Sequence, residues 1–283
     1  MAAQLTRIIS DLHFGEHACR IGRLPQLSPL LEGVTHAVLN GDSLDTRPGP
    51  RPAHTSETRE AVRAFFSREV ADTTFLTGNH DADFSDRHFL DLARGAVFIT
   101  HGDVFFDDMV PWSQDAPHIR RLLAAEFKAR PAHLRHDLAH RLAAFRRVAI
   151  QVPQRHQSET NRLKYALHYL VDTVWPPQRM LRVVHTWHIA PRLAMEHTQR
   201  HRPRAHFVIS GHTHRPGIWR GRNGLVAINT GSFCPPLSGQ CVDLTDTTLT
   251  VRPVEYRRGE ARPGAPIAEF PLAESGSFPK TVP

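Results

Sequence analysis

The chain of 283 residues has little cysteine, and its three cysteines, Cys19, Cys234 and Cys241, make no recognisable framework. Their number is odd, and none of them lies in a CxxC motif. A disulfide-stabilised scaffold and a thiolate-held structural zinc site are therefore not expected, and a reducing compartment is favoured.

Long apolar runs are also missing. No stretch approaches eighteen consecutive apolar residues, and the segment Met1–Ile9 has no long hydrophobic region typical of a secretory signal. We therefore expect no transmembrane span. The expected location is cytoplasmic, with peripheral contact at the inner membrane as the alternative.

Positive charge, in contrast, is in excess. The sequence has 35 Lys and Arg against 28 Asp and Glu, which gives a formal net charge of +7 and a pI near 10.0. This excess suggests an anionic partner, whether a nucleic acid, a phosphorylated substrate or a membrane surface. The hydrophobic content of 40% is ordinary for one large globular domain, or for one domain with an insertion.

One pattern recurs along the chain: a short apolar segment ends, and a polar cluster able to bind metal follows at once. The segments are Leu5–Ser10, His36–Asn40, Thr73–Thr77, Ala96–Thr100 and Ala205–Ser210; the clusters are Asp11-Leu12-His13, Gly41-Asp42-Ser43-Leu44-Asp45, Gly78-Asn79-His80-Asp81, His101-Gly102-Asp103 and Gly211-His212-Thr213-His214.

The apolar segments read as strands, and they alternate with helical patterns such as Ser56–Ala71. This alternation predicts an α/β fold with a mainly parallel sheet, in which ligands bind at the carboxyl ends of the strands. Five polar clusters at five strand ends therefore predict a single site. Glycines in these clusters fit the sharp turns and close backbone approach that such a site requires.

The segment 112–204 differs from the rest of the chain. It shows helical periodicity, and residues 112–205 carry 17 Lys and Arg against 6 Asp and Glu. Apolar stripes are expected at Ile119, Leu122, Leu123 and Phe127, at Leu134, Leu138, Leu142 and Phe145, and at Leu163, Leu167, Leu170 and Val174. A solvated helix face, a lid that binds an anionic substrate or a membrane, and a nucleic-acid surface are the three interpretations, with nucleic acid the least favoured.

Beyond the last polar cluster, short strands are expected at 217–219, 225–229, 240–244 and 249–254, with a hairpin turn at Asn223-Gly224. Proline and glycine dominate afterwards. The expected organisation is a catalytic domain over 1–256, which contains the helical insertion 112–204, followed by a loosely ordered tail over 257–283.

The polar clusters supply seven candidate metal ligands that lack sulfur, a set suited to Mn, Fe or Zn. They are Asp11, His13, Asp42, Asn79, His101, His212 and His214. Seven ligands are too many for one ion but suffice for two divalent ions that share a bridging carboxylate. Such a pair is used in two-metal phosphate hydrolysis.

The ordered motifs DxH, GDxxD, GNHD, HGD and GHTH resemble those of the calcineurin-like metallophosphoesterases. The resemblance implies a four-layer α/β/β/α sandwich. It assigns Asp11, His13, Asp42 and His214 to one ion, and Asp42, Asn79, His101 and His212 to the other, with Asp42 bridging.

The same resemblance gives a catalytic role to His80, next to the ligand Asn79, as a group that stabilises the transition state or protonates the leaving group. Asp81 is expected to orient the His80 imidazole. Asp45 and Asp103 are either supports for the ligands or ordinary turn residues.

The segment Thr100–Asp108, the helical insertion and Gly211–Pro216 are similar to one branch of this family, the UDP-2,3-diacylglucosamine pyrophosphatases of lipid A synthesis. That branch implies a lipid-linked nucleotide diphosphate as substrate, but it carries Arg where this chain has His80. A nuclease and a non-catalytic protein-binding scaffold are the alternative functions.

Overall fold

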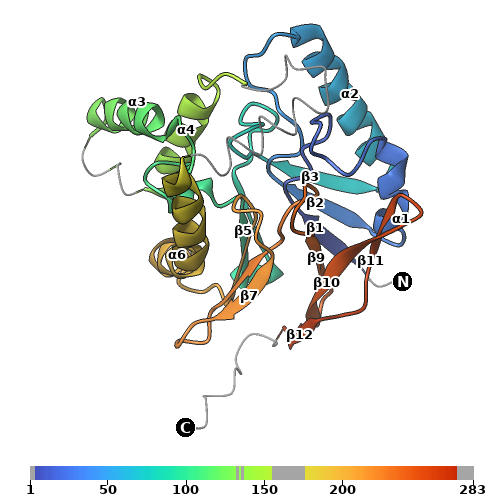
Figure 1. The fold of residues 1–283 in the computed structure, drawn as a ribbon. Helices are drawn as coiled ribbons and strands as arrows, with labels where there is room; N and C mark the ends of the chain where they lie inside the picture. Colours follow the sequence, from blue (N-terminus) through green and yellow to red (C-terminus); the bar gives the residue numbers. More distant parts are fainter. Residues whose placement is uncertain (1–3, 132–133, 135–136, 155–175, 273–283) are drawn as a thin grey trace.

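The computed structural model describes residues 4–131, 134, 137–154 and 176–272. The chain builds two mixed β-sheets that pack against each other, with helices on the outer faces (Figure 1). The first sheet has the strand order β11-β10-β9-β1-β2-β3, and β12 also pairs with β10. Its strands are β1 (Thr6–Ile9), β2 (His36–Asn40), β3 (Asp72–Leu76), β9 (Gln240–Leu244), β10 (Thr248–Arg257), β11 (Glu260–Pro263) and β12 (Ala268–Pro271).

The second sheet has the order β4-β5-β6-β8-β7. Its strands are β4 (Phe89–Leu92), β5 (Val97–Thr100), β6 (Phe207–Ser210), β7 (Gly217–Arg220) and β8 (Val226–Asn229). Strands β1, β2 and β3 are parallel, as are β5, β6 and β8, and the other strand pairs are antiparallel. The expectation of mainly parallel pairing therefore holds for one side of the first sheet, which ends at β3, and for the centre of the second.

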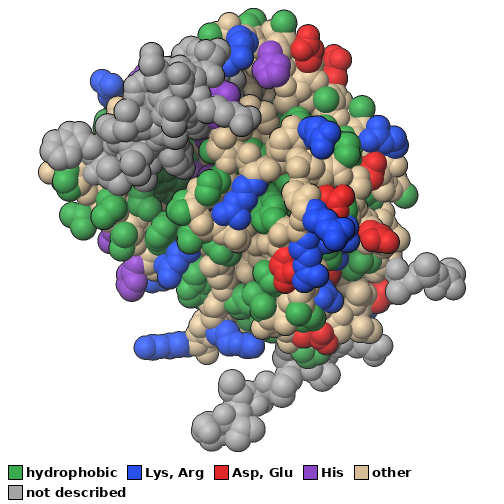
Figure 2. Space-filling view, turned by 45° about the vertical axis from the view of Figure 1, so that its right-hand side comes forward, with side chains coloured by type: hydrophobic (Ala, Val, Ile, Leu, Met, Phe, Trp, Pro, Cys, Tyr) green, Lys and Arg blue, Asp and Glu red, His purple; other side chains and the backbone are tan. Residues whose placement is uncertain are grey.

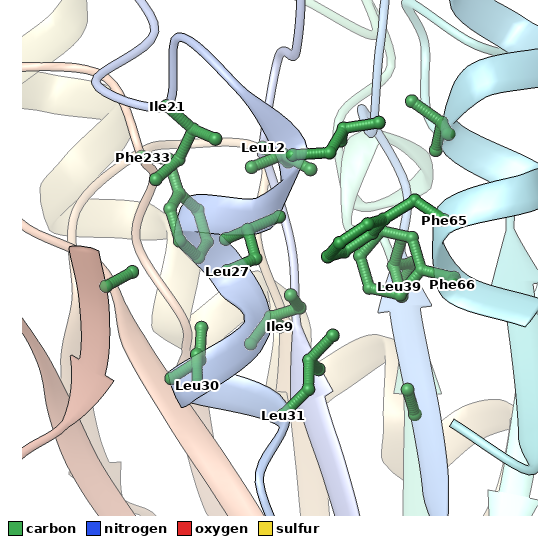
Figure 3. Packing of buried hydrophobic residues seen from close by; sticks show 14 of the residues in the cluster. Ile9, Leu12, Ile21, Leu27, Leu30, Leu31, Leu39, Phe65, Phe66 and Phe233 are labelled. Atoms are coloured by element: carbon green, nitrogen blue, oxygen red, sulfur yellow. The ribbon is translucent and has the colours of Figure 1, made fainter. Parts of the chain in front are cut away.

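Alternating side chains of the strands divide the core into layers. Ile8 and Val38 of the first sheet pack with Ile99 and Ile209 of the second, and this apolar layer joins the two sheets. The opposite face of the first sheet packs on α1 (Ser28–Leu31) and α2 (Pro52–Glu69), where Figure 3 shows Phe66 of α2 beside Leu39 of β2. The four-layer α/β/β/α sandwich is confirmed.

The helical insertion covers the outer face of the second sheet. It contains α3 (Ala116–Lys128), α4 (Leu138–Ala149) and α6 (Pro177–His201). The first two apolar stripes are confirmed in part, because Ile119, Leu123, Leu142 and Phe145 are buried. The third stripe lies outside the described residues.

The surface of α6 is partly apolar. Met180, Leu181 and Val184 are among the exposed large hydrophobic side chains, whereas charged and hydrophobic side chains are mixed over the right-hand part of Figure 2. Among the helices that the structure describes, none is long and apolar enough to cross a bilayer.

Two expectations about local structure are corrected. The segment 257–283 is not a loosely ordered tail throughout, because β11 and β12 lie in it and pair with β10. The strand β4 was not expected, since Phe89–Leu92 carries a charged residue and no alternating pattern, and its pairing with β5 determines its conformation.

A half-buried histidine on α6, His197, makes stability depend on pH. His197 packs against the ring of Phe105 at a centroid distance of 5.3 Å. Neither of its ring nitrogens has a hydrogen-bond partner among the described residues. Burial, together with the charges of His201, Arg141 and Arg200, lowers the pKa of His197 to about 3.

Because this pKa is depressed, the unfolded chain binds a proton more readily than the folded protein. Stability is therefore lost as the pH falls from 6.5, the usual pKa of histidine, towards 3. Between about pH 8 and about pH 5, the wild type should lose about 2 kcal/mol more of its free energy of unfolding than His197→Leu does. Urea unfolding of both proteins at the two pH values measures this difference. An equal loss in the two proteins would contradict the depressed pKa of His197.

Candidate metal centre

The five polar clusters meet at one edge of the sandwich, as the sequence predicts. Asp11 and His13 follow β1, Asp42 follows β2 and Asn79 follows β3, while His101 follows β5 and His212 and His214 follow β6. Six of these seven side chains are buried, and His214 is partly exposed. The two sheets thus contribute to a common site.

Asp11, His13 and His214 form the first group of candidate ligands, whose ligand atoms all lie within 4.8 Å of one another. The Nε2 atoms of His13 and His214 are 3.1 Å apart, and His214 Nε2 lies 3.3 Å from Asp11 Oδ1. Two imidazole nitrogens and a carboxylate oxygen converging in this way match the ligand set of a divalent metal ion.

Asp42, His101 and His212 form the second group, within the same 4.8 Å limit. Asp42 Oδ2 lies 3.3 Å from His101 Nε2 and 3.8 Å from His13 Nε2, so this carboxylate stands between the two groups. His101 Nε2 and Asn79 Oδ1 are buried with no hydrogen-bond partner in the described part of the protein. Buried polar atoms rarely lack a partner, and two bare ligand atoms at this point fit a metal ion.

In three of the histidines, one ring nitrogen lies near an oxygen acceptor that orients the ring. Metal-binding histidines are usually oriented in this way. His13 Nδ1 lies 3.0 Å from Glu16 Oε1, His101 Nδ1 lies 3.0 Å from the carbonyl oxygen of Asn40, and His212 Nε2 lies 2.8 Å from that of Met109. Each contact leaves the remaining nitrogen free to act as a ligand.

The backbone at the site is strained. Five of the seven candidates have left-handed φ angles: Asp11 (51°), His13 (48°), Asp42 (51°), His212 (67°) and His214 (55°). Such conformations cost about 1–3 kcal/mol each in residues other than glycine, and they cluster at functional sites. The fold therefore maintains this arrangement against the local preference of the chain.

Two of the glycines give the ligand side chains room. A Cβ atom at Gly78 would collide with the carboxylate of Asp42, and one at Gly211 would collide with that of Asp11. The expectation that glycines permit close backbone approach is confirmed at both positions.

Charges of opposite sign are balanced within the site. Burial raises the pKa of Asp42, but the imidazoles of His101, His80 and His13 outweigh burial and hold that pKa well below its usual value. Burial raises the pKa of Asp103 to about 6, against the effect of His101. Asp103 is thus a buried neighbour of the ligand His101.

Asp81 does not orient the His80 imidazole, so that expectation is wrong. Its Oδ1 accepts hydrogen bonds from the backbone N–H groups of Gly78 (2.6 Å) and Asp42 (3.0 Å), and its Oδ2 accepts one from Ser43 (2.7 Å). Burial raises the pKa of Asp81 to about 6. Asp81 instead fixes the two loops that carry Asp42 and Asn79.

The surroundings of His80 come from other residues. His80 Nδ1 lies 3.4 Å from Asp45 Oδ2, 3.6 Å from Glu16 Oε1 and 2.9 Å from Arg47 Nη2. Burial and Arg47 lower the pKa of His80, but Asp42, Asp45 and Glu16 outweigh them and raise it to about 10. The side chain is 25% exposed, so a substrate can reach it.

Asp45 makes an ordinary turn contact, because its Oδ1 accepts a hydrogen bond from the backbone N–H of Arg47 (3.1 Å), and its Oδ2 lies near His80; support of the metal ligands stays a prediction. Asp45 also binds the Arg47 guanidinium through both carboxylate oxygens, at 3.0 and 2.7 Å. The helical insertion contributes Gln154, whose Nε2 donates to the carbonyl of Asp45 (3.0 Å) and whose backbone N–H donates to that of Pro48 (2.8 Å). The insertion therefore holds the loop that faces His80.

Sequence reasoning missed Glu16, Arg47, Gln154 and the Met109 carbonyl. The spacing of Glu16, three residues after His13, could have suggested a contact, but a backbone carbonyl leaves no trace in the sequence. The segment 229–232 also supports the site. Asn229 Nδ2 donates a hydrogen bond to the carbonyl oxygen of Gly211, and Ser232 Oγ donates one to the carbonyl oxygen of Asp11 (3.1 Å).

Comparison with known proteins agrees with this geometry. Residues 5–250 match the model of the calcineurin-like phosphoesterase superfamily domain. The chain belongs to this superfamily. No curated protein matches the chain significantly.

Several solved structures are similar at low sequence identity. They include a predicted phosphoesterase from Streptococcus pneumoniae (16% identity, 96% of this chain and 99% of that chain covered, TM-score 0.40), a dimetal phosphatase from Danio rerio (13%, 97% and 100%, 0.45) and Vps29 complexed with Zn²⁺ from Entamoeba histolytica (12%, 95% and 100%, 0.41).

As a member of this superfamily, the chain is a hydrolase of the general phosphoesterase type. The two groups of candidate ligands agree with a dependence on metal ions.

Proposed function

We propose that the protein is a dinuclear metal-dependent phosphoester hydrolase. The observation that carries the proposal is a single carboxylate, Asp42, placed between two groups of ligands. Asp11, His13 and His214 would hold one ion, and His101, His212 and Asn79 the other. Mn, Fe and Zn all suit this donor set.

Two such ions, when bound, supply an activated water at neutral pH and neutralise the charge that develops on phosphoryl oxygens. The chain's own residues prepare the site for this chemistry. Glu16 and the carbonyls of Asn40 and Met109 fix the imidazoles, and burial keeps bulk water away from the ligands. These contacts hold the ligands in position before the substrate arrives.

His80 is the proposed proton donor or electrostatic stabiliser for the departing group. It follows Asn79 directly, it is partly exposed, and its backbone N–H donates to Asp42 Oδ1 (2.8 Å). The negative charges around its ring favour the protonated imidazole, which is the form that can give up a proton. Asp45 and Arg47 act on the reaction through the position and the pKa of this ring.

The substrate is proposed to be an anionic phosphoester. The excess of Lys and Arg in the insertion supports this class, and a lipid-linked nucleotide diphosphate, as in the UDP-2,3-diacylglucosamine branch, is one member of it. Contact of the insertion with an anionic membrane belongs to the same proposal.

A hydrolysis panel with Mn²⁺ tests the function. It compares an aryl phosphate monoester, a diester, a cyclic nucleotide and a UDP-linked lipid with wild-type protein and with His212→Ala. We expect turnover of at least one substrate by the wild type and none by the variant. Equal turnover by both proteins, or no turnover of any substrate by metal-supplemented wild type, would contradict the proposal.

A further inference from the structure

A cavity of about 610 Å³ lies between α6 and the β7–β8 hairpin, apart from the candidate metal ligands. Its volume falls in the range of small-molecule sites, roughly 300–1,000 Å³. Trp187, Arg192 and Met195 line it from α6, and Arg215, Trp219 and Arg222 line it from the other side.

The aromatic part of this cavity is fixed by specific contacts. The Arg215 guanidinium lies over the rings of Trp187 and Trp219, at 5.9 and 5.8 Å from their centroids. Arg215 Nη1 also donates to the carbonyl oxygen of Trp187 (3.0 Å). Two indoles and one guanidinium therefore form a prearranged wall, whose flat faces suit an aromatic ring.

This wall is joined to the candidate metal centre. Trp187 Nε1 donates to the carbonyl oxygen of Thr213 (2.8 Å), and Thr213 lies between His212 and His214 in the chain. Arg215 follows His214 directly. The wall is therefore held in a fixed position relative to the segment that carries these two ligands.

The charged side chains that line the cavity favour a ligand of negative charge. Arg192, Arg215 and Arg222 face the cavity together with a single acidic residue, Glu196. Glu196 forms a long ion pair with Arg192 at 3.8 Å, which leaves the charge of the other two guanidiniums in excess. An anionic group is favoured by this balance, and a cationic one is disfavoured.

We propose that the cavity binds a negatively charged aromatic group in the part of the substrate that extends beyond the phosphorus under attack. This substrate role rests on the proposed phosphoesterase function, whereas binding of the aromatic anion does not. The two halves are tested separately.

The first test measures binding of 1-naphthalenesulfonate to chelator-treated, metal-free protein by titration calorimetry. We expect saturable binding that is about tenfold tighter than that of 1-butanesulfonate, which has no ring, and of 1-naphthalenemethanol, which has no charge. Trp219→Leu and Arg222→Ser should each weaken binding about tenfold.

Arg220→Ser is the matched control, because Arg220 is an exposed residue of the same hairpin that stacks on Phe270 instead of lining the cavity. Its affinity for the probe should equal that of the wild type. Absence of saturable binding, or equal weakening by the Arg220 and Arg222 variants, would overturn the proposal. The melting temperature of each variant excludes unfolding as the cause.

The second test uses metal-loaded protein with two substrates, 5-sulfo-1-naphthyl phosphate, whose naphthyl group carries its own negative charge, and ethyl phosphate. Trp219→Leu should raise KM about tenfold for the naphthyl ester and much less for the ethyl ester. If Trp219→Leu changes the KM of both esters equally while the wild type binds the naphthalenesulfonate probe, the cavity is a site for a free aromatic anion. That result would overturn the substrate role. Probe binding without hydrolysis of any ester would contradict the proposed function and leave the cavity assignment standing.

Discussion

The Asp42→Asn variant is expected to lose hydrolytic activity by a factor of about 10³ or more. Asp42 Oδ2 lies 3.8 Å from His13 Nε2 and 3.3 Å from His101 Nε2, so this carboxylate stands between the two ligand groups. An amide keeps the shape of the side chain but removes the charge that both ions would share. Initial rates and metal content, measured on the same sample, should fall together.

Asp86→Asn is the control for this substitution. The side chain of Asp86 is 97% exposed and pairs with Arg146 on the surface, so the same chemical change there should leave rate and metal content unaltered. Retention of wild-type turnover in Asp42→Asn would show that this carboxylate does not bridge two ions.

His80→Asn is expected to lower kcat by about 10²–10⁴ while leaving the metal content unchanged. His80 approaches the site between Asp45, Glu16 and Arg47, and its ring is not part of either group that contains Asp42 or His214. Asparagine can still donate a hydrogen bond, but it cannot transfer a proton at neutral pH. The loss should therefore be in kcat more than in KM.

His118→Asn is the control, because His118 is an exposed residue of α3 outside the three groups of candidate ligands. If His80→Asn loses metal as well as rate, His80 is a metal ligand rather than the proton donor. This second outcome has a structural basis, because His13, Glu16 and His80 also form a group within 4.8 Å.

The sequence predicted the positions of the ligands well because each follows a short buried strand. Local patterns identify such strands, and parallel strands bring their carboxyl ends to one edge of a sheet. Asp11, Asp42, His101 and His212 could thus be placed together without any knowledge of the distances between them.

The supporting residues could not be predicted, because they depend on tertiary packing. Asp45 and Gln154 are 109 positions apart in the sequence and meet only when the insertion returns to the loop after β2. Asp81 looked like a partner of His80 because the two are neighbours in the chain. Its carboxylate instead accepts hydrogen bonds from backbone N–H groups that would otherwise lack a partner.

The strands β11 and β12 illustrate the same limit. Proline and glycine around them suggested a loose tail, but β10 is long enough to pair with both segments as well as with β9. Pairing with an existing strand outweighs weak local preference, so the end of the described chain became part of the first sheet.

The most direct test of the two-ion centre is the number of metal ions bound per chain after Mn²⁺ or Zn²⁺ supplementation and removal of free metal, measured by inductively coupled plasma mass spectrometry. The geometry predicts about two ions in the wild type and about one or fewer in Asp42→Asn, because two groups of ligands share that carboxylate. Less than one ion per wild-type chain would contradict a dinuclear hydrolase and favour a non-catalytic scaffold.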